Sequence, residues 1–131
     1  MHIAPLYASI LALMFVGLSV RTLRMRGRFR IAIGDGGNPE MLRAMRVHSN
    51  FAEYVPLSLL LIYFVETGGA SPVFVHVLGL CLLAGRASHA FGVSRIEENF
   101  RFRAFGMAMT FATLVAASAY LIHSYVGGMI A

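Results

Sequence analysis

The chain has 131 residues, of which 58% are hydrophobic and only 13% are charged. Soluble globular domains are about 45–50% apolar and about 25% charged. Together with a mean hydropathy of +0.72, this composition argues against a soluble domain and predicts a membrane protein. The length allows one compact domain, residues 1–131, and no second one.

Four helices are predicted in chain order, over residues 2–20, 39–65, 72–92 and 104–126. Each contains an apolar run close to the length of about 20 residues that a helix needs to cross the hydrocarbon core. Membrane strands would be about 10 residues long and would alternate apolar with polar side chains. The predicted fold class is therefore all-α, an integral membrane bundle of four spanning helices.

The first predicted helix differs from a secretory signal peptide. No basic residue precedes its apolar run, and no small-residue cleavage site follows it. We therefore expect this segment to remain as a helix. The single cysteine, Cys81, lies in the middle of the third helix, which excludes a disulfide framework.

The positive charge is confined to two connections. All eleven basic residues are arginines, and they lie between or at the ends of the first two helices and of the last two: Arg21, Arg24, Arg26, Arg28, Arg30, Arg43, Arg46, Arg86, Arg95, Arg101 and Arg103. Short arginine-rich loops stay in the cytoplasm, so both termini are expected on the opposite side of the membrane. Such loops also bind anionic lipid headgroups, and no nucleic-acid motif accompanies them.

The second helix is predicted to begin at "NPE". Asn38 suits the N-cap position, Pro39 suits the first turn, and Glu40 interacts favourably with the helix dipole. The glycines just before this segment permit a tight turn.

A polar stripe runs along the cytoplasmic half of this helix. With about 100° per residue, Arg43, Asn50 and Glu53 lie about +60°, +40° and −20° from Arg46, whereas His48 points elsewhere. Charged groups facing lipid cost a few kcal/mol each, so the stripe must face other helices or a wet cavity. We expect the partners of Arg46 and Glu53 on neighbouring helices. A network that only stabilises helix packing is the alternative.

A second basic cluster lies at the end of the third predicted helix and the start of the fourth. Arg86 and His89 are three residues apart and share a face, and Arg103 leads into the fourth helix. Glu97 and Glu98 are candidate ion-pair partners there. No His, Cys or carboxylate set has metal-ligand spacing.

The arginines at this side favour an anionic guest. Guanidinium groups bind carboxylates in forked pairs, and a nearby positive charge lowers the pKa of a thiol. A small anionic thiol and a phospholipid both fit this chemistry.

The stretch "NPEMLRAMRVHSNFAEYVPLSLLL" resembles the second-helix signature of the MAPEG family, the membrane-associated proteins of eicosanoid and glutathione metabolism. Arg46, Asn50, Glu53 and Pro56 match its spacing, and the four-helix layout extends the resemblance to essentially the whole chain. The "GDGGNPE" run is similar to the small bacterial members, which implies a bacterial inner membrane with both termini in the periplasm.

The resemblance implies a homotrimer that binds glutathione between adjacent subunits near the cytoplasmic face, with the lipophilic substrate entering from the bilayer. It assigns the thiolate-holding role to Arg103. It assigns glutathione-site or supporting roles to residues on the first three helices: Arg46, Asn50, Glu53, Arg86, His89 and either Arg24 or Arg28.

Two functions follow from this resemblance. The first is a glutathione transferase or peroxidase acting on lipophilic electrophiles. The second is a non-catalytic membrane scaffold that binds a lipid or a partner protein, because the family includes such members and Val93 stands where its enzymes usually carry a tyrosine. An ion path through Glu53 and His48 is disfavoured, since these residues point to different faces.

Overall fold

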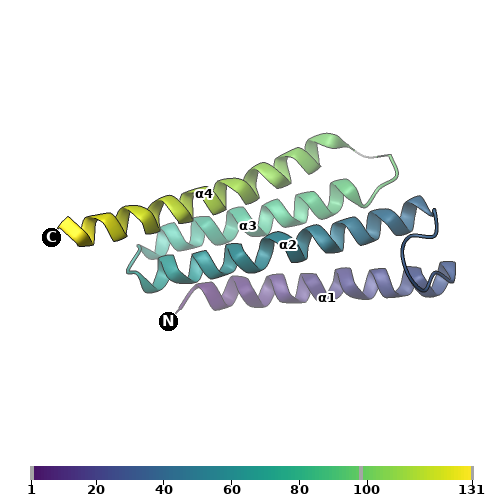
Figure 1. Ribbon diagram of the computed structural model, residues 1–131, viewed down its shortest axis with the longest axis horizontal. Helices are drawn as coiled ribbons and strands as arrows, with labels where there is room; N and C mark the ends of the chain where they lie inside the picture. The colour runs from purple at the N-terminus through teal and green to yellow at the C-terminus, as the bar shows by residue number, and fades with distance from the viewer. Residues whose placement is uncertain (1, 98, 131) are drawn as a thin grey trace.

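The protein is a bundle of four long helices (Figure 1), seen in a computed structural model that describes residues 2–97 and 99–130. The elements are α1 (Ala4–Phe29), α2 (Pro39–Thr67), α3 (Pro72–Val93) and α4 (Phe100–Ile130). The described residues contain no strand, so the all-α prediction is confirmed. Both termini lie at one end of the bundle. We call the opposite end, where α1 and α3 finish and α2 and α4 begin, the arginine end.

The helix starts follow from local capping. The Asn38 side chain accepts a hydrogen bond from the Met41 backbone N–H at 3.0 Å, which confirms the predicted start of α2. Ser71 does the same at the start of α3, where its hydroxyl accepts from the Phe74 N–H at 3.3 Å.

Two helices are longer than predicted. α1 continues past residue 20 to Phe29, and ends where Arg30 turns into the left-handed region at φ 56°. α4 spans Phe100–Ile130 rather than 104–126. The prediction followed the apolar runs, whereas arginine is a good helix former. The helices therefore continue beyond the apolar layer into the arginine end.

The length and composition of the helices support three of the four predicted membrane spans. Among the described helices, α1, α3 and α4 are long and apolar enough to cross a bilayer, whereas α2 is not. The stripe containing Arg46, Asn50 and Glu53 interrupts its apolar run, which leaves mainly residues 54–65. α2 nevertheless runs beside the other helices along the bundle (Figure 1).

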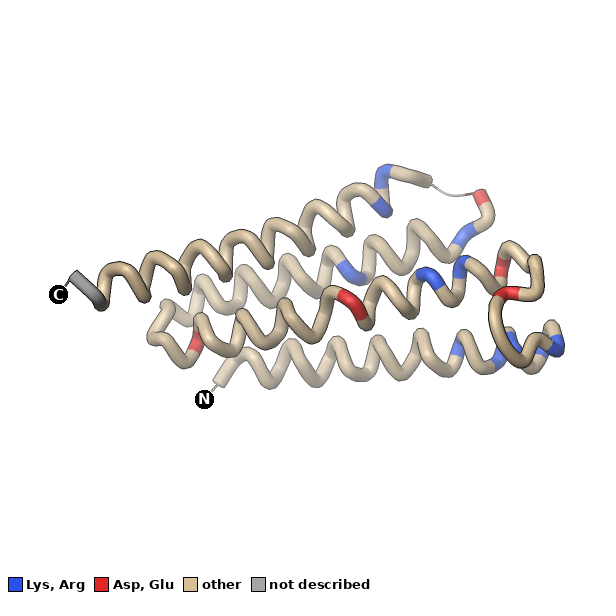
Figure 2. Tube along the Cα trace, in the orientation of Figure 1, with Lys and Arg blue, Asp and Glu red and all other residues tan. Residues whose placement is uncertain are grey.

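The outer surface is apolar over most of the bundle. Leu13, Val115 and Ile122 are each more than 60% exposed, an arrangement that costs about 1.5–3 kcal/mol per side chain in water and nothing in lipid. Charged residues gather instead toward the arginine end (Figure 2). These features are those of an integral membrane protein.

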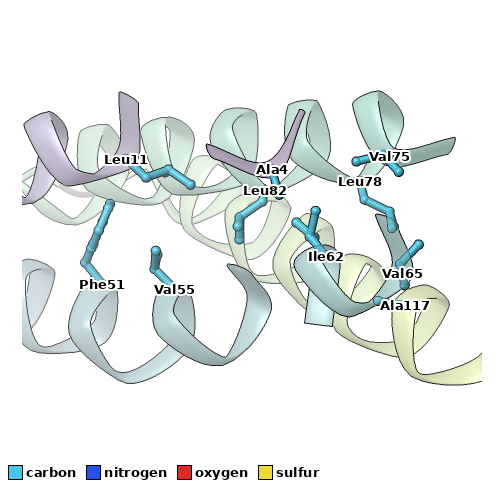
Figure 3. Packing of buried hydrophobic residues seen from close by; sticks show 10 residues of the cluster. All are labelled: Ala4, Leu11, Phe51, Val55, Ile62, Val65, Val75, Leu78, Leu82 and Ala117. Carbon is cyan, nitrogen blue, oxygen red and sulfur yellow. The ribbon is translucent and has the colours of Figure 1, made fainter. Parts of the chain in front are cut away.

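The core lies between the helices (Figure 3), where side chains from all four of them pack together. Leu11 of α1, Ile62 of α2 and Leu82 of α3 are completely buried there, with Ala117 of α4 beside them. This packing sets the rotation of each helix and hence the direction in which the polar stripe of α2 points.

Candidate functional site

A cavity of about 290 Å³ opens at the arginine end between α2, α3 and α4. Its volume is at the lower end of the range of about 300–1,000 Å³ that is typical of small-molecule sites. Ten of the described residues line it: Pro39, Leu42, Arg43, Arg46, Ser49, Asn50 and Glu53 from α2, His89 and Val93 from α3, and Arg103 from α4.

α2 supplies the largest part of this wall. Arg43, Arg46, Asn50 and Glu53 all line the cavity, as their helical spacing predicts. His48 points toward α1 instead. Its Nε2 lies 3.0 Å from the Ser19 hydroxyl, and its ring stacks on Phe15 at 4.8 Å between centroids. The stripe and His48 therefore belong to different surfaces of the same helix.

Close packing between α3 and α4 positions the other wall. A Cβ added to Gly106 would lie 2.6 Å from the Gly85 carbonyl oxygen, and one added to Gly92 would lie 2.9 Å from the Arg103 nitrogen. Only glycine allows two helix backbones to come this close. This approach places His89 of α3 and Arg103 of α4 at the same cavity.

The cavity wall carries more positive than negative charge. Among the described residues, three arginines line it, Arg43, Arg46 and Arg103, and one carboxylate, Glu53. Within the part of the chain that the structure describes, no ion pair within 4 Å involves Arg46 or Glu53, so the partners expected on neighbouring helices are not found there. This wall favours an anionic guest.

Arg86 lies behind the cavity wall and does not line it. Its side chain is only 1% exposed, and its Nη1 donates to Asn50 Oδ1 at 2.7 Å. Nη2 lies 3.5 Å from the Met107 sulfur, and the guanidinium carbon lies 5.9 Å from the centre of the Tyr54 ring. Its contact with the cavity is through Asn50.

Arg24 and Arg28 lie apart from this cavity. They line a second, larger one of about 610 Å³, formed by α1 together with one residue at the start of α2. The other residues there are Gly17, Val20, Arg21, Met25 and Glu40. The structure thus brings together six of the eight predicted site residues, five in the wall and Arg86 behind it.

Several lining residues were missing from the predicted site. Arg43 belongs to the stripe already recognised, and Ser49 lies about 60° from Arg46 on the same helical projection. Val93 follows His89 by one turn. Arg43 also bridges two helices, because its Nη1 donates to the Val93 carbonyl at 3.2 Å. The helical spacing alone therefore indicates that Arg43, Ser49 and Val93 can face the cavity.

Two remaining predictions concern the connection between α3 and α4. Glu97 is exposed and makes no ion pair within 4 Å among the described residues, and Glu98 lies outside those residues. No group of three or more His, Cys, Asp or Glu side chains that could hold a metal ion occurs in residues 2–97 and 99–130.

Comparison with known proteins identifies the family of this chain. The model of the MAPEG family matches residues 4–123. The inner membrane protein YecN of Escherichia coli, strain K12, is 39% identical over 113 residues, which cover 86% of this chain and 85% of the relative. The YecN sequence of strain CFT073 matches to the same extent. The chain belongs to the MAPEG family, which includes glutathione transferases and related enzymes.

Proposed function

We propose that this protein is a membrane-embedded, glutathione-dependent transferase or peroxidase that acts on lipophilic electrophiles. The observation that carries the proposal is the cavity at the arginine end, where three arginines and one carboxylate of the described residues line the wall. Glutathione has two carboxylates and one ammonium group, so its charges complement this wall.

The arginines have two tasks in this proposal. Arg46 and Arg43 bind carboxylate oxygens of glutathione through forked hydrogen bonds, while Glu53 accepts from its ammonium group. Arg103 holds the sulfur and lowers the pKa of the thiol, which raises the fraction of reactive thiolate. The thiolate then attacks the electrophile, a sulfur–carbon bond forms, and the leaving group departs with its electron pair.

The site is proposed to lie at the cytoplasmic boundary of the inner membrane. Short arginine-rich connections stay in the cytoplasm, which places both termini in the periplasm and the cavity mouth within reach of cytoplasmic glutathione. The lipophilic substrate reaches the same boundary through the bilayer, with α2 crossing beside the other three helices.

A homotrimer with the site between subunits is part of the proposal. The cavity is open on one side, and the second basic cavity, with Arg24 and Arg28, belongs to a different face of the bundle. In a ring of subunits one face can meet the other, so that a first-helix arginine completes the neighbouring site. Native mass spectrometry in detergent measures the subunit number directly.

One observation favours the non-catalytic alternative. Val93, an apolar residue, lies in the cavity wall where enzymes of the family usually carry a tyrosine. A scaffold that binds a lipid or a partner protein has no need of a hydroxyl at that position.

Calorimetric titration of the detergent-solubilised protein with glutathione separates the two functions. Binding with a Kd of about 1 mM or tighter, together with conjugation of a general electrophile such as chlorodinitrobenzene, is expected for the enzyme. Absence of both heat and thermal stabilisation by glutathione favours the scaffold.

A further inference from the structure

The contact between Arg86 and Asn50 determines which atoms Asn50 presents to the cavity. A guanidinium group has only donors. The Asn50 atom that lies 2.7 Å from Arg86 Nη1 must therefore be the amide oxygen. The usual ambiguity between the oxygen and nitrogen of an asparagine side chain is removed by the chemistry of its neighbour.

Arg86 is held firmly enough to impose this orientation. Its side chain is buried to 1% exposure between α2, α3 and α4, with Met107 at Nη2 and the Tyr54 ring alongside. The preceding residue, Gly85, packs directly against the backbone of Gly106. No carboxylate of the described residues lies within 4 Å of the guanidinium, and its buried Nε has no hydrogen-bond partner there.

The amide nitrogen of Asn50 is left for a ligand. Asn50 lines the cavity, and no described residue accepts a hydrogen bond from its Nδ2. Arg46 lies one helical turn away and lines the same cavity. This part of the wall therefore offers hydrogen-bond donors from Asn50 and Arg46, and the positive charge of Arg86 lies behind them.

We infer that Arg86 is a positioning residue that holds the Asn50 amide with its NH2 group toward the cavity, and thereby selects a ligand carboxylate over a neutral amide at this position. The inference rests on the proposed function, because it names the ligand group that this part of the site recognises. Arg86 itself touches no ligand in this account.

The direct test compares glutathione with its two monoamides, in each of which one carboxylate is replaced by a carboxamide. Hydrogen bonds to charged groups are about twice as strong as neutral ones, so the wild type is expected to bind one monoamide about tenfold more weakly than glutathione. Arg86→Met should reduce this ratio of the two dissociation constants to about twofold, since the Asn50 side-chain amide can then rotate. Arg86→Lys, which keeps a donor-only side chain, should retain most of the ratio.

The matched control is Arg95→Met, which removes an arginine that lies over Phe91 at 4.3 Å and does not line the cavity. It should leave the ratio at the wild-type value. A ratio unchanged in Arg86→Met overturns the inference, because a merely structural role for Arg86 alters both affinities together.

A second measurement needs no glutathione and therefore separates the contact from the proposed function. Asn50→Asp places a carboxylate against Arg86, so it should raise the unfolding temperature in the wild-type background and lower it in the Arg86→Met background. Equal effects in the two backgrounds overturn the inference even where glutathione binds. If this coupling is present but the wild type binds neither glutathione nor its monoamides, the proposed function fails and the selectivity fails with it.

Discussion

Two charged groups on neighbouring helices, the partly buried Glu66 and the buried Arg86, have opposite surroundings. Glu66 lies in the last turn of α2, at the end of the bundle that holds the termini, and its carboxylate accepts from the backbone N–H groups of Ile3 and Ala4. His2 Nδ1 lies 3.8 Å from the same group. Arg86 makes one short hydrogen bond, to Asn50, and has no carboxylate within 4 Å among the described residues.

The difference indicates a structural role for Glu66 and a functional one for Arg86. Glu66 satisfies the first N–H groups of α1, whose own N-cap residue, Ile3, supplies no side-chain acceptor. Its partners all belong to the chain, and they complete a helix start. A buried guanidinium without a counter-charge is costly, and this one lies directly behind a cavity rich in arginine. Such local costs are concentrated at functional sites.

The largest effect is expected at the arginine end, where Arg103 is proposed to hold the glutathione sulfur. Arg103→Ala should lower the rate of glutathione conjugation by about 100-fold or more, the usual loss when one group that stabilises a developing charge is removed. The oligomer should remain intact by size-exclusion chromatography. Arg101→Ala is the control, since Arg101 lies only two residues earlier and lines a different cavity. Equal losses in the two variants would remove Arg103 from the mechanism.

The next effect concerns the helix approach that builds the arginine end. Gly106→Leu forces a side chain against the Gly85 carbonyl, so it should destabilise the protein by about 1–3 kcal/mol and weaken glutathione binding. Gly127→Leu is the matched control, because Gly127 is exposed on α4 and a Cβ there has no atom within 4 Å. Thermal unfolding and calorimetry on both variants measure the difference. A Gly106 variant that binds like the wild type would show that the α3–α4 approach does not position the site.

A smaller effect is expected at the end that holds the termini. Glu66→Gln keeps one acceptor but loses the charge, so it should lower the stability by about 1 kcal/mol. Glutathione binding should not change. Glu97→Gln, an exposed carboxylate, serves as the control for stability. A loss of glutathione binding in Glu66→Gln would contradict the separation of the two ends.

The smallest change in stability is expected at Arg86. Replacing a buried charge by an apolar side chain of similar length is often neutral or stabilising. The free energy of unfolding of Arg86→Met should therefore lie within about 1 kcal/mol of the wild-type value or exceed it. Chemical denaturation in detergent measures this directly. A loss of several kcal/mol in the free energy of unfolding would show that Arg86, like Glu66, mainly stabilises the fold.

The features of the site that depend on a single helix could be predicted from the sequence. The shared face of Arg46, Asn50 and Glu53 follows from the helical repeat, and the start of α2 follows from Asn38. Those three residues do line one cavity. The opposite direction of His48 follows from the same repeat.

The parts that depend on helix packing could not be read from the sequence. The contact between Asn50 and Arg86 requires the register of α2 against α3, which the core sets. Glu66 reaches the start of α1 across more than 60 residues of chain. The convergence of His89 and Arg103 depends on glycines whose close approach is visible only once α3 and α4 are placed together.

The most direct test of the central claim is an experimental structure of the protein determined with glutathione. Glutathione density is expected against Arg46, Asn50 and Arg103, with a carboxylate oxygen within hydrogen-bond distance of Asn50 Nδ2. Glutathione bound wholly within the cavity of Arg24 and Arg28, or absent from the protein at saturating concentration, would contradict it.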